Sequence, residues 1–154
     1  MKPSSVLSDS LEDYLEAIFH IEKAKQAARA KDIARRMNVK SPSVTGALQA
    51  LARRNLINYS PYDLVTLTEK GREAARDVVR RHTVLLRFFI DILDADPKEA
   101  EKVACRMEHA LPSGIMERLI GFVEYLSSGG EKEGQDLIEE FKEYYDRVSR
   151  TADD

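Results

Sequence analysis

Apolar residues recur every three or four positions along most of this chain, which is the spacing of helices that bury one face. In the first stretch the stripe consists of Leu11, Leu15 and Ile18. The longest stretch also carries arginines on its opposite side, as expected of an amphipathic helix. The helices predicted in this way cover residues 8–24, 69–93, 98–110, 115–126 and 131–150.

Two further helices separated by a tight turn are predicted between residues 29 and 54. Asn38 suits the left-handed backbone conformation that ends a helix. Ser41 stands before Pro42, which predicts a capping hydroxyl followed by a proline at the first helical position. The pattern is that of a helix-turn-helix. On its second helix, the residues expected to face the core are Val44, Leu48 and Leu51.

The outer face of this second helix is small and polar and ends in cations, as a recognition helix in the major groove of DNA requires. Gly46 lies on this face although glycine costs a helix about 1 kcal/mol relative to alanine, which indicates a close neighbour at that point. Gln49 is the best candidate for an adenine contact. The expected DNA-binding residues are Lys40, Ser41, Pro42, Ser43, Thr45, Gln49 and Arg53. The alternative is an αα-hairpin packed on another helix.

Between residues 56 and 68 the pattern changes to that of strands. β-branched and aromatic residues lie on both sides of a proline-containing turn at residues 60–63. We therefore expect a two-stranded hairpin, which directly after a recognition helix is the wing of a winged helix. Thr68 is expected to cap the helix that follows.

The last two predicted helices are rich in apolar residues. Residues 115–126 present more apolar surface than one core needs, which predicts a dimer interface; packing within one subunit is the alternative. That apolar set is Ile115, Met116, Leu119, Ile120 and Val123. A flexible joint is expected at residues 127–130, followed by a final acidic helix. The side chains of this helix that are expected to face the core are Leu137, Ile138, Phe141, Tyr145 and Val148.

If residues 98–110 are helical, Cys105, Glu108 and His109 fall at i, i+3 and i+4, so a thiol, a carboxylate and an imidazole share one face. This is a spacing of metal ligands, and Glu101 lies one turn earlier on that face. Three donors on one helix cannot complete a coordination shell, so other ligands are expected from elsewhere in the chain. The alternative is a core cysteine beside two surface polar residues.

Other candidate ligands lie earlier in the chain. Asp13, Glu16 and His20 are spaced three and four apart on the first helix, where they form either a solvated edge or half of a cation site. His82 lies on the apolar stripe of the long helix, where a satisfied core histidine is the alternative to a ligand.

The net charge of −3 is unevenly distributed along the chain. Residues 1–90 hold 16 Lys and Arg against 10 Asp and Glu, and the remainder holds 8 against 17, which gives +6 and −9. A basic first part favours a polyanionic partner that does not touch the acidic part. The lone cysteine excludes an internal disulfide. No apolar run approaches the roughly 18 residues of a membrane span, so we expect a cytoplasmic protein with no membrane partner.

The order of these motifs, over about residues 8 to 125, resembles the diphtheria-toxin-repressor family of iron- and manganese-dependent transcriptional regulators. The resemblance rests on Leu-Glu-Asp-Tyr-Leu-Glu, Ser-Pro-Ser-Val-Thr, Leu-Thr-Glu-Lys-Gly, Arg-Arg-His and Cys-Arg-Met-Glu-His. It implies a mainly α fold, with a winged helix-turn-helix at residues 1–72 and a helical metal-binding and dimerisation domain at residues 73–154. It also implies a homodimer that binds a palindromic double-stranded DNA operator when loaded with Mn²⁺ or Fe²⁺.

Carried over by position, the resemblance implies the metal ligands Asp13, Glu16, His82, Cys105, Glu108 and His109, with Glu101 as a possible addition. Asp13 and a chain of this length are similar to the shorter manganese-sensing branch, which lacks an SH3-like domain. Cys105 is instead the residue of the iron-sensing branch. Leu86 and Glu101 stand where that branch has a glutamate and a histidine in an ancillary site. These donors suit Mn²⁺ or Fe²⁺, while Zn²⁺, Co²⁺ or Ni²⁺ can bind in vitro.

The implied mechanism is metal-dependent repression, in which one cation joins ligands of the DNA-binding half to ligands of the dimer half. Such coupling usually amounts to about 1–3 kcal/mol, or about 5- to 150-fold in DNA affinity. The alternative is a winged-helix regulator that responds to a small organic ligand or to oxidation of Cys105. No nucleophile-base constellation or phosphate-binding glycine loop is present in the sequence, so an enzyme is not expected.

Overall fold

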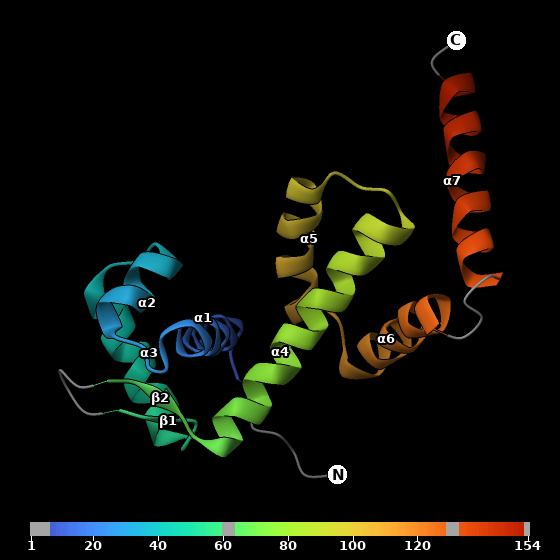
Figure 1. Ribbon diagram of the computed structural model, residues 1–154. Helices are drawn as coiled ribbons and strands as arrows, with labels where there is room; N and C mark the ends of the chain where they lie inside the picture. Colours follow the sequence, from blue (N-terminus) through green and yellow to red (C-terminus); the bar gives the residue numbers. More distant parts are fainter. Residues whose placement is uncertain (1–6, 60–63, 129–132, 153–154) are drawn as a thin grey trace. The chain divides into compact units, whose positions relative to one another are not determined.

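The computed structural model describes residues 7–59, 64–128 and 133–152 of the chain (Figure 1). The chain falls into two compact units, Met1–Val79 and Arg80–Asp154. The predicted mainly α fold is confirmed, and within the described residues no helix is long and apolar enough to cross a membrane. The elements are α1 (Asp9–Lys25), α2 (Ala30–Met37), α3 (Ser41–Arg53), β1 (Ile57–Asn58), β2 (Thr66–Leu67), α4 (Glu69–Arg87), the π-helix η1 (Phe88–Ile92), α5 (Pro97–Ala110), α6 (Ser113–Ser128) and α7 (Glu133–Ala152).

The first unit is a winged helix-turn-helix. Helices α1, α2 and α3 enclose a core whose largest fully buried side chains include Leu15, Ile18, Ile33, Leu48 and Leu51. These are the residues that the helical period places on the inner faces, because positions three and four apart share one side of a helix. The apolar stripes predicted for α1 and α3 are therefore confirmed.

The turn between α2 and α3 follows the prediction at one end and departs from it at the other. Asn38 has φ 54° and ψ 45°, and its backbone N–H donates to the carbonyls of Ala34 and Arg35. The predicted Ser41 cap is wrong, because Ser41 is the first residue of α3 and the capping position falls to Lys40, which makes no side-chain cap bond. Pro42 still lies in the first turn, where its missing N–H has no partner within the helix.

The wing is the predicted antiparallel hairpin. Ile57 pairs with Leu67 and Asn58 with Thr66. An isolated bridge joins Ala28 to Val65, which ties the hairpin to the segment between α1 and α2. The turn predicted at residues 60–63 lies outside the described residues.

Thr68 caps α4 as predicted. Its hydroxyl accepts a hydrogen bond from the Gly71 N–H at 3.0 Å and donates one to the Asn55 carbonyl at 2.7 Å. Gly71 has to be glycine, since a Cβ there would lie 1.7 Å from the Leu56 carbonyl oxygen. The start of α4 is thus fixed against the end of the recognition helix and the first wing strand.

We expect Thr68→Ala to lower the free energy of unfolding by about 1–2 kcal/mol, the usual cost of losing an N-terminal cap. The midpoint of thermal or denaturant unfolding measures this change. The matched control is Thr45→Ala, because the exposed Thr45 hydroxyl donates to the Ser41 carbonyl of its own helix. The cost of this substitution should stay within about 0.5 kcal/mol. Equal losses in the two variants would contradict the capping role.

The second unit contains a separate helical core. Its buried residues are Val84, Leu85, Ile92, Ala104, Met116, Ile120, Val123 and Leu126. The helix predicted over residues 69–93 has nearly the predicted extent, but from Phe88 to Ile92 it is a π-helix, which the sequence did not predict. The wider turn allows the neighbouring rings of Phe88 and Phe89 to pack together against this core. Asp96 then caps α5 by accepting hydrogen bonds from the N–H groups of Lys98 and Glu99, and Pro97 is the first residue of the helix.

The structure corrects the inward and outward faces predicted for α6 and α7. Met116, Ile120 and Val123 are buried in their own subunit and are not a free surface for a partner. Ile115 of the predicted interface is exposed, and so are further apolar residues of α6 and α7: Phe122, Tyr125, Leu137, Phe141, Tyr144 and Tyr145. On α7, Ile138 is the described apolar side chain that packs against the core. The flexible joint predicted at residues 127–130 is wrong in its first half, because Ser127 and Ser128 are the last residues of α6. Residues 129–130 and the Val148 side chain lie outside the described part of the chain.

Candidate metal centre

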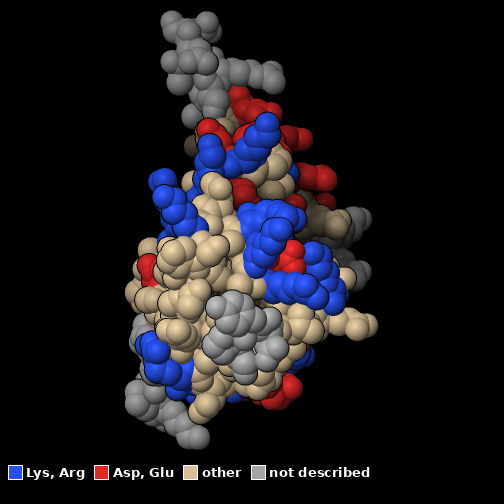
Figure 2. Space-filling model, turned by 90° about the vertical axis from the view of Figure 1, so that its left-hand side faces the viewer, with Lys and Arg blue, Asp and Glu red and all other residues tan. Residues whose placement is uncertain are grey.

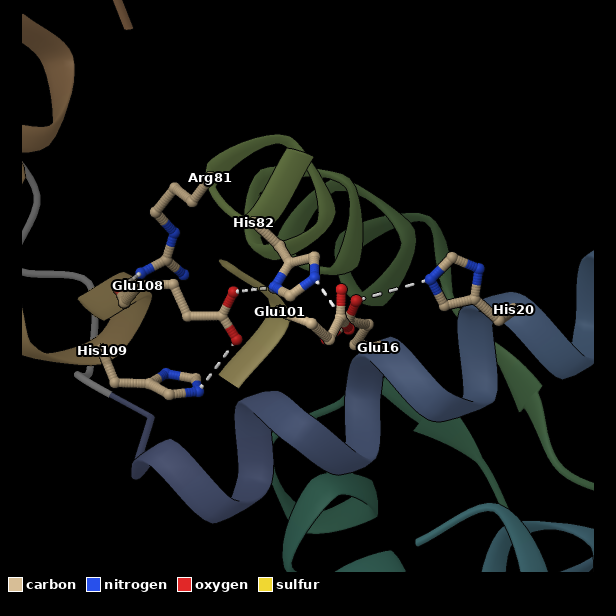
Figure 3. A network of polar contacts seen from close by, with 7 residues as sticks. All are labelled: Glu16, His20, Arg81, His82, Glu101, Glu108 and His109. Atoms are coloured by element: carbon tan, nitrogen blue, oxygen red, sulfur yellow. Dashed lines mark hydrogen bonds and ion pairs between the residues drawn. The ribbon is translucent and has the colours of Figure 1, made fainter. Parts of the chain in front are cut away.

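The centre of the candidate site is a buried carboxylate. Glu108 of α5 is 1% exposed, and it is the one buried charged residue among those that the structure describes. Its two oxygens face two imidazoles: Oε2 lies 2.7 Å from Nδ1 of His82, and Oε1 lies 3.2 Å from Nε2 of His109. Figure 3 shows both rings turned toward the carboxylate. Because a buried charge is costly unless it is paired or bound to a metal, this arrangement needs cationic partners.

His82 joins the last turns of α4 to α5. Its second ring nitrogen, Nε2, lies 3.3 Å from Oε1 of Glu101, so carboxylates face both nitrogens of the ring. The His82 side chain is 12% exposed, whereas that of Glu101 is 57% exposed. A histidine of the apolar core would have no such polar surroundings, so His82 belongs to a polar cluster.

Cys105 supplies the third type of donor. This residue is exposed, and it lies one turn before Glu108 on α5. One ligand atom each from His82, Cys105 and Glu108 lie within 4.8 Å of one another. Imidazole, thiolate and carboxylate at this separation fit a divalent transition metal, with oxygen favouring Mn²⁺ and sulfur favouring softer ions.

Residues 98–110 are helical, so Cys105, Glu108 and His109 have the predicted spacing along α5. Glu108 lies between His82 and His109, and Cys105 lies with His82 and Glu108. The spacing within α5 could not show that His82 of α4 joins this cluster.

Asp13 and Glu16 lie on α1 in the first unit, both partly buried. Glu16 Oε1 is 3.4 Å from Nε2 of His20, one turn later on the same helix (Figure 3). The neighbouring Tyr14 faces the core, and burial raises the pKa of its hydroxyl. The acidic face of α1 is thus separate from its apolar face, as the period predicts.

Arg81 is a residue that sequence reasoning missed. Its Nη1 donates to the backbone carbonyl of Glu108 at 3.1 Å, which fixes the last turn of α5 beside α4. The sequence showed Arg81 only as part of a cationic side of the long helix. A bond to a backbone carbonyl leaves no signal in the sequence, so the contact could not be found without coordinates.

The recognition helix presents the predicted polar face. All seven predicted DNA-binding residues are exposed. A Cβ added at Gly46 would meet nothing within 4 Å, so no contact inside the described chain explains this glycine. Figure 2 looks onto the side that carries α2, α3 and the wing, where Lys and Arg side chains are spread widely with few acidic ones among them. Such a face suits the phosphate backbone of DNA.

Comparisons with known proteins agree with this geometry. The model of the iron dependent repressor N-terminal DNA binding domain matches residues 6–65, and that of the metal binding and dimerisation domain matches residues 68–140. An uncharacterized HTH-type transcriptional regulator of Methanocaldococcus jannaschii is 39% identical over 119 residues, covering 77% of this chain and 95% of the relative. The regulator MntR of Shouchella clausii is 32% identical over 138 residues, with 90% and 92% covered.

A solved structure described as a manganese-dependent transcriptional repressor complex with manganese has the same fold. It superposes with a TM-score of 0.67 at 28% identity, and the match covers 75% of this chain and 53% of that chain. The chain thus spans nearly all of the two sequence relatives but about half the length of the solved repressor.

Proposed function

Since the chain belongs to the iron-dependent repressor family, we propose that it represses genes of metal-ion homeostasis. It does so by binding a palindromic operator as a homodimer when loaded with Mn²⁺ or Fe²⁺. In this proposal residues 1–72 bind DNA, residues 73–154 bind metal and form the dimer, and the protein acts in the cytoplasm. The relatives are transcriptional regulators, in agreement with the expectation that the chain is not an enzyme.

The observation that carries the proposal is the buried Glu108 carboxylate between two histidines, with Cys105 beside it. His82 Nδ1 and Glu108 Oε2 form a hydrogen bond at 2.7 Å, and His109 Nε2 lies 3.2 Å from Glu108 Oε1. A divalent cation would be held by the nitrogen, sulfur and oxygen atoms of this cluster, with the ligand atoms deprotonated. The proposed ligands are His82, Cys105, Glu108 and His109, with Glu101 as a possible addition.

Asp13 and Glu16 complete the proposed ligand set. Their inclusion rests on the order of motifs in the sequence and on family membership. They belong to the DNA-binding unit, whereas the other ligands belong to the dimerisation unit. A cation bound by both sets would favour one orientation of the recognition helices, which is the differential binding that a metal switch requires.

DNA recognition is assigned to the exposed polar face of α3. Gln49 contacts a base edge, and Lys40 and Arg53 contact phosphates; Ser41, Pro42, Ser43 and Thr45 line the approach at the start of the helix. The exposure of all these side chains and the open space at Gly46 support the assignment.

The decisive experiment is operator binding followed by fluorescence anisotropy while Mn²⁺ or Fe²⁺ is titrated anaerobically. We expect the affinity to rise by about 5- to 150-fold on metal loading. Elemental analysis of the purified protein and metal-dependent thermal stabilisation provide independent readouts. An affinity that does not change with metal would contradict the proposal, as would an unchanged metal response in an Asp13→Ala and Glu108→Ala double variant.

The thiol is expected to set the preference between metals. Replacing Cys105 by glutamate exchanges a soft ligand for a hard one, so the response should move from Fe²⁺ toward Mn²⁺, with the ratio of activating concentrations changing by about tenfold. The measurement is the same anisotropy titration with each metal. Cys105→Ser is the matched control, because it removes the thiolate without adding a carboxylate and should weaken the response to both metals. An unchanged order of metals in Cys105→Glu would show that the thiol does not set selectivity.

A further inference from the structure

A groove of about 390 Å³ lies in the first unit, and none of its lining residues is among those assigned above. It runs between the second half of α1 and the start of α4. The lining residues are Phe19, Glu22, Lys23, Gln26, Arg72 and Arg76. Three of them lie in α1 at helical spacing and Gln26 is the residue that ends this helix, while the two from α4 are one turn apart. Each helix therefore turns one continuous face to the groove.

The single carboxylate of the groove already has partners. Glu22 Oε1 accepts a hydrogen bond from Nη2 of Arg72 at 2.8 Å, and Oε2 accepts one from the Leu67 N–H at 3.3 Å. The hydrogen bond to Glu22, together with its charge, raises the pKa of the Arg72 guanidinium. Glu22 therefore holds Arg72 and the second wing strand in place.

Two further cations face the groove without such compensation. Lys23 and Arg76 are exposed, and neither forms a hydrogen bond or ion pair with another residue in the parts of the chain that the structure describes. By contrast, the nearby Lys25 pairs with Asp32 at 3.1 Å. Like charges beside one groove raise the local positive potential, which attracts and retains an anion.

The rest of the lining gives the groove an apolar side and a neutral polar end. The partly buried Phe19 offers an aromatic ring on the same face as Lys23. Gln26, in the left-handed position that ends α1, offers an amide with two donors and one acceptor. The volume falls within the range of small-molecule sites, about 300–1,000 Å³. A ligand with both an anionic group and a flat apolar body matches these features.

We propose that this groove binds a small organic anion with an aromatic or similarly flat body. Lys23 and Arg76 bind the anionic group, Glu22 keeps Arg72 in position beside them, and the Phe19 ring packs against the apolar body. This site goes beyond the proposed metal-dependent repression and requires neither metal nor operator. A small effector site on α1 and α4 would give the regulator a second input.

Phenyl phosphate is a suitable probe, because it joins a dianion to an aromatic ring. We expect it to cause saturable shifts of the Gln26 side-chain amide and of the Arg76 Nε–H signal in ¹⁵N-resolved NMR spectra of the full metal-free chain. Inorganic phosphate, which lacks the ring, and benzyl alcohol, which lacks the charge, should bind more weakly. The absence of saturable phenyl phosphate binding would overturn the proposal.

The double variant Lys23→Gln and Arg76→Gln should bind phenyl phosphate about tenfold more weakly, the combined effect of two exposed charge contacts. The matched control is Lys31→Gln and Arg36→Gln, which removes two exposed charges from α2 of the same unit and should leave binding unchanged. Equal binding in the two variants would overturn the proposal. A second result would also overturn it: inorganic phosphate binds with the same affinity as phenyl phosphate, and the groove variant loses affinity for duplex DNA while the control variant does not. The groove would then be a contact for the DNA backbone.

Discussion

Glu108→Gln should abolish the response of operator binding to metal. The substitution keeps the size of the side chain but replaces a carboxylate by an amide, which is a far weaker ligand for a divalent cation. Both oxygens of Glu108 face histidines in a buried position, so this carboxylate lies at the centre of the proposed ligand set. We expect the affinity in saturating Mn²⁺ to fall to the metal-free value, a loss of up to about 150-fold, measured by anisotropy with a labelled operator.

Glu101→Gln is the matched control for this substitution. Glu101 lies on the same helix and also faces His82, but its side chain is 57% exposed and reaches only the second ring nitrogen. We expect the metal response of this variant to remain within about threefold of the original, as for other exposed charged contacts. If Glu108→Gln kept the full metal response, or if only Glu101→Gln lost it, Glu108 would not be the central ligand of the site.

The residues of the first unit were predictable because their structure depends on local signals. Asn38 ends α2 in the left-handed conformation, and Thr68 caps α4, as their side-chain chemistry predicts. The missed cap at Ser41 is a displacement of one residue, since proline is tolerated at more than one position of the first helical turn. Periodicity and capping therefore defined this unit well.

The second unit was harder to predict because its arrangement depends on contacts between helices. The spacing of Cys105, Glu108 and His109 indicated a metal site, but it could not show that His82 of α4 lies against Glu108. The apolar residues of α6 and α7 likewise recur with a helical period, and this period does not show which of them face the core of the subunit and which are exposed. Met116 faces its own core while Phe141 is exposed, and only the packing distinguishes them.

Substitutions at Gly46 should separate the stability of the fold from its affinity for DNA. A Cβ at this position meets nothing within 4 Å of the chain. Gly46→Ala should therefore raise the free energy of unfolding by about 1 kcal/mol, the difference in helix propensity. In Gly46→Leu the larger side chain should keep α3 out of the major groove and lower operator affinity by about 100-fold, equivalent to losing one or two base contacts. Thermal unfolding and anisotropy measure the two quantities on the same samples.

The control for Gly46 is another glycine in an open helical position. Gly114 in the first turn of α6 also has nothing within 4 Å of an added Cβ, and it lies outside the winged-helix unit. Gly114→Ala should leave operator affinity unchanged. A stable Gly46→Leu variant that binds the operator as tightly as the original would mean that this face of α3 does not approach DNA. Loss of affinity without loss of stability would instead identify Gly46 as a point of close contact, because the free protein gains nothing from a glycine there.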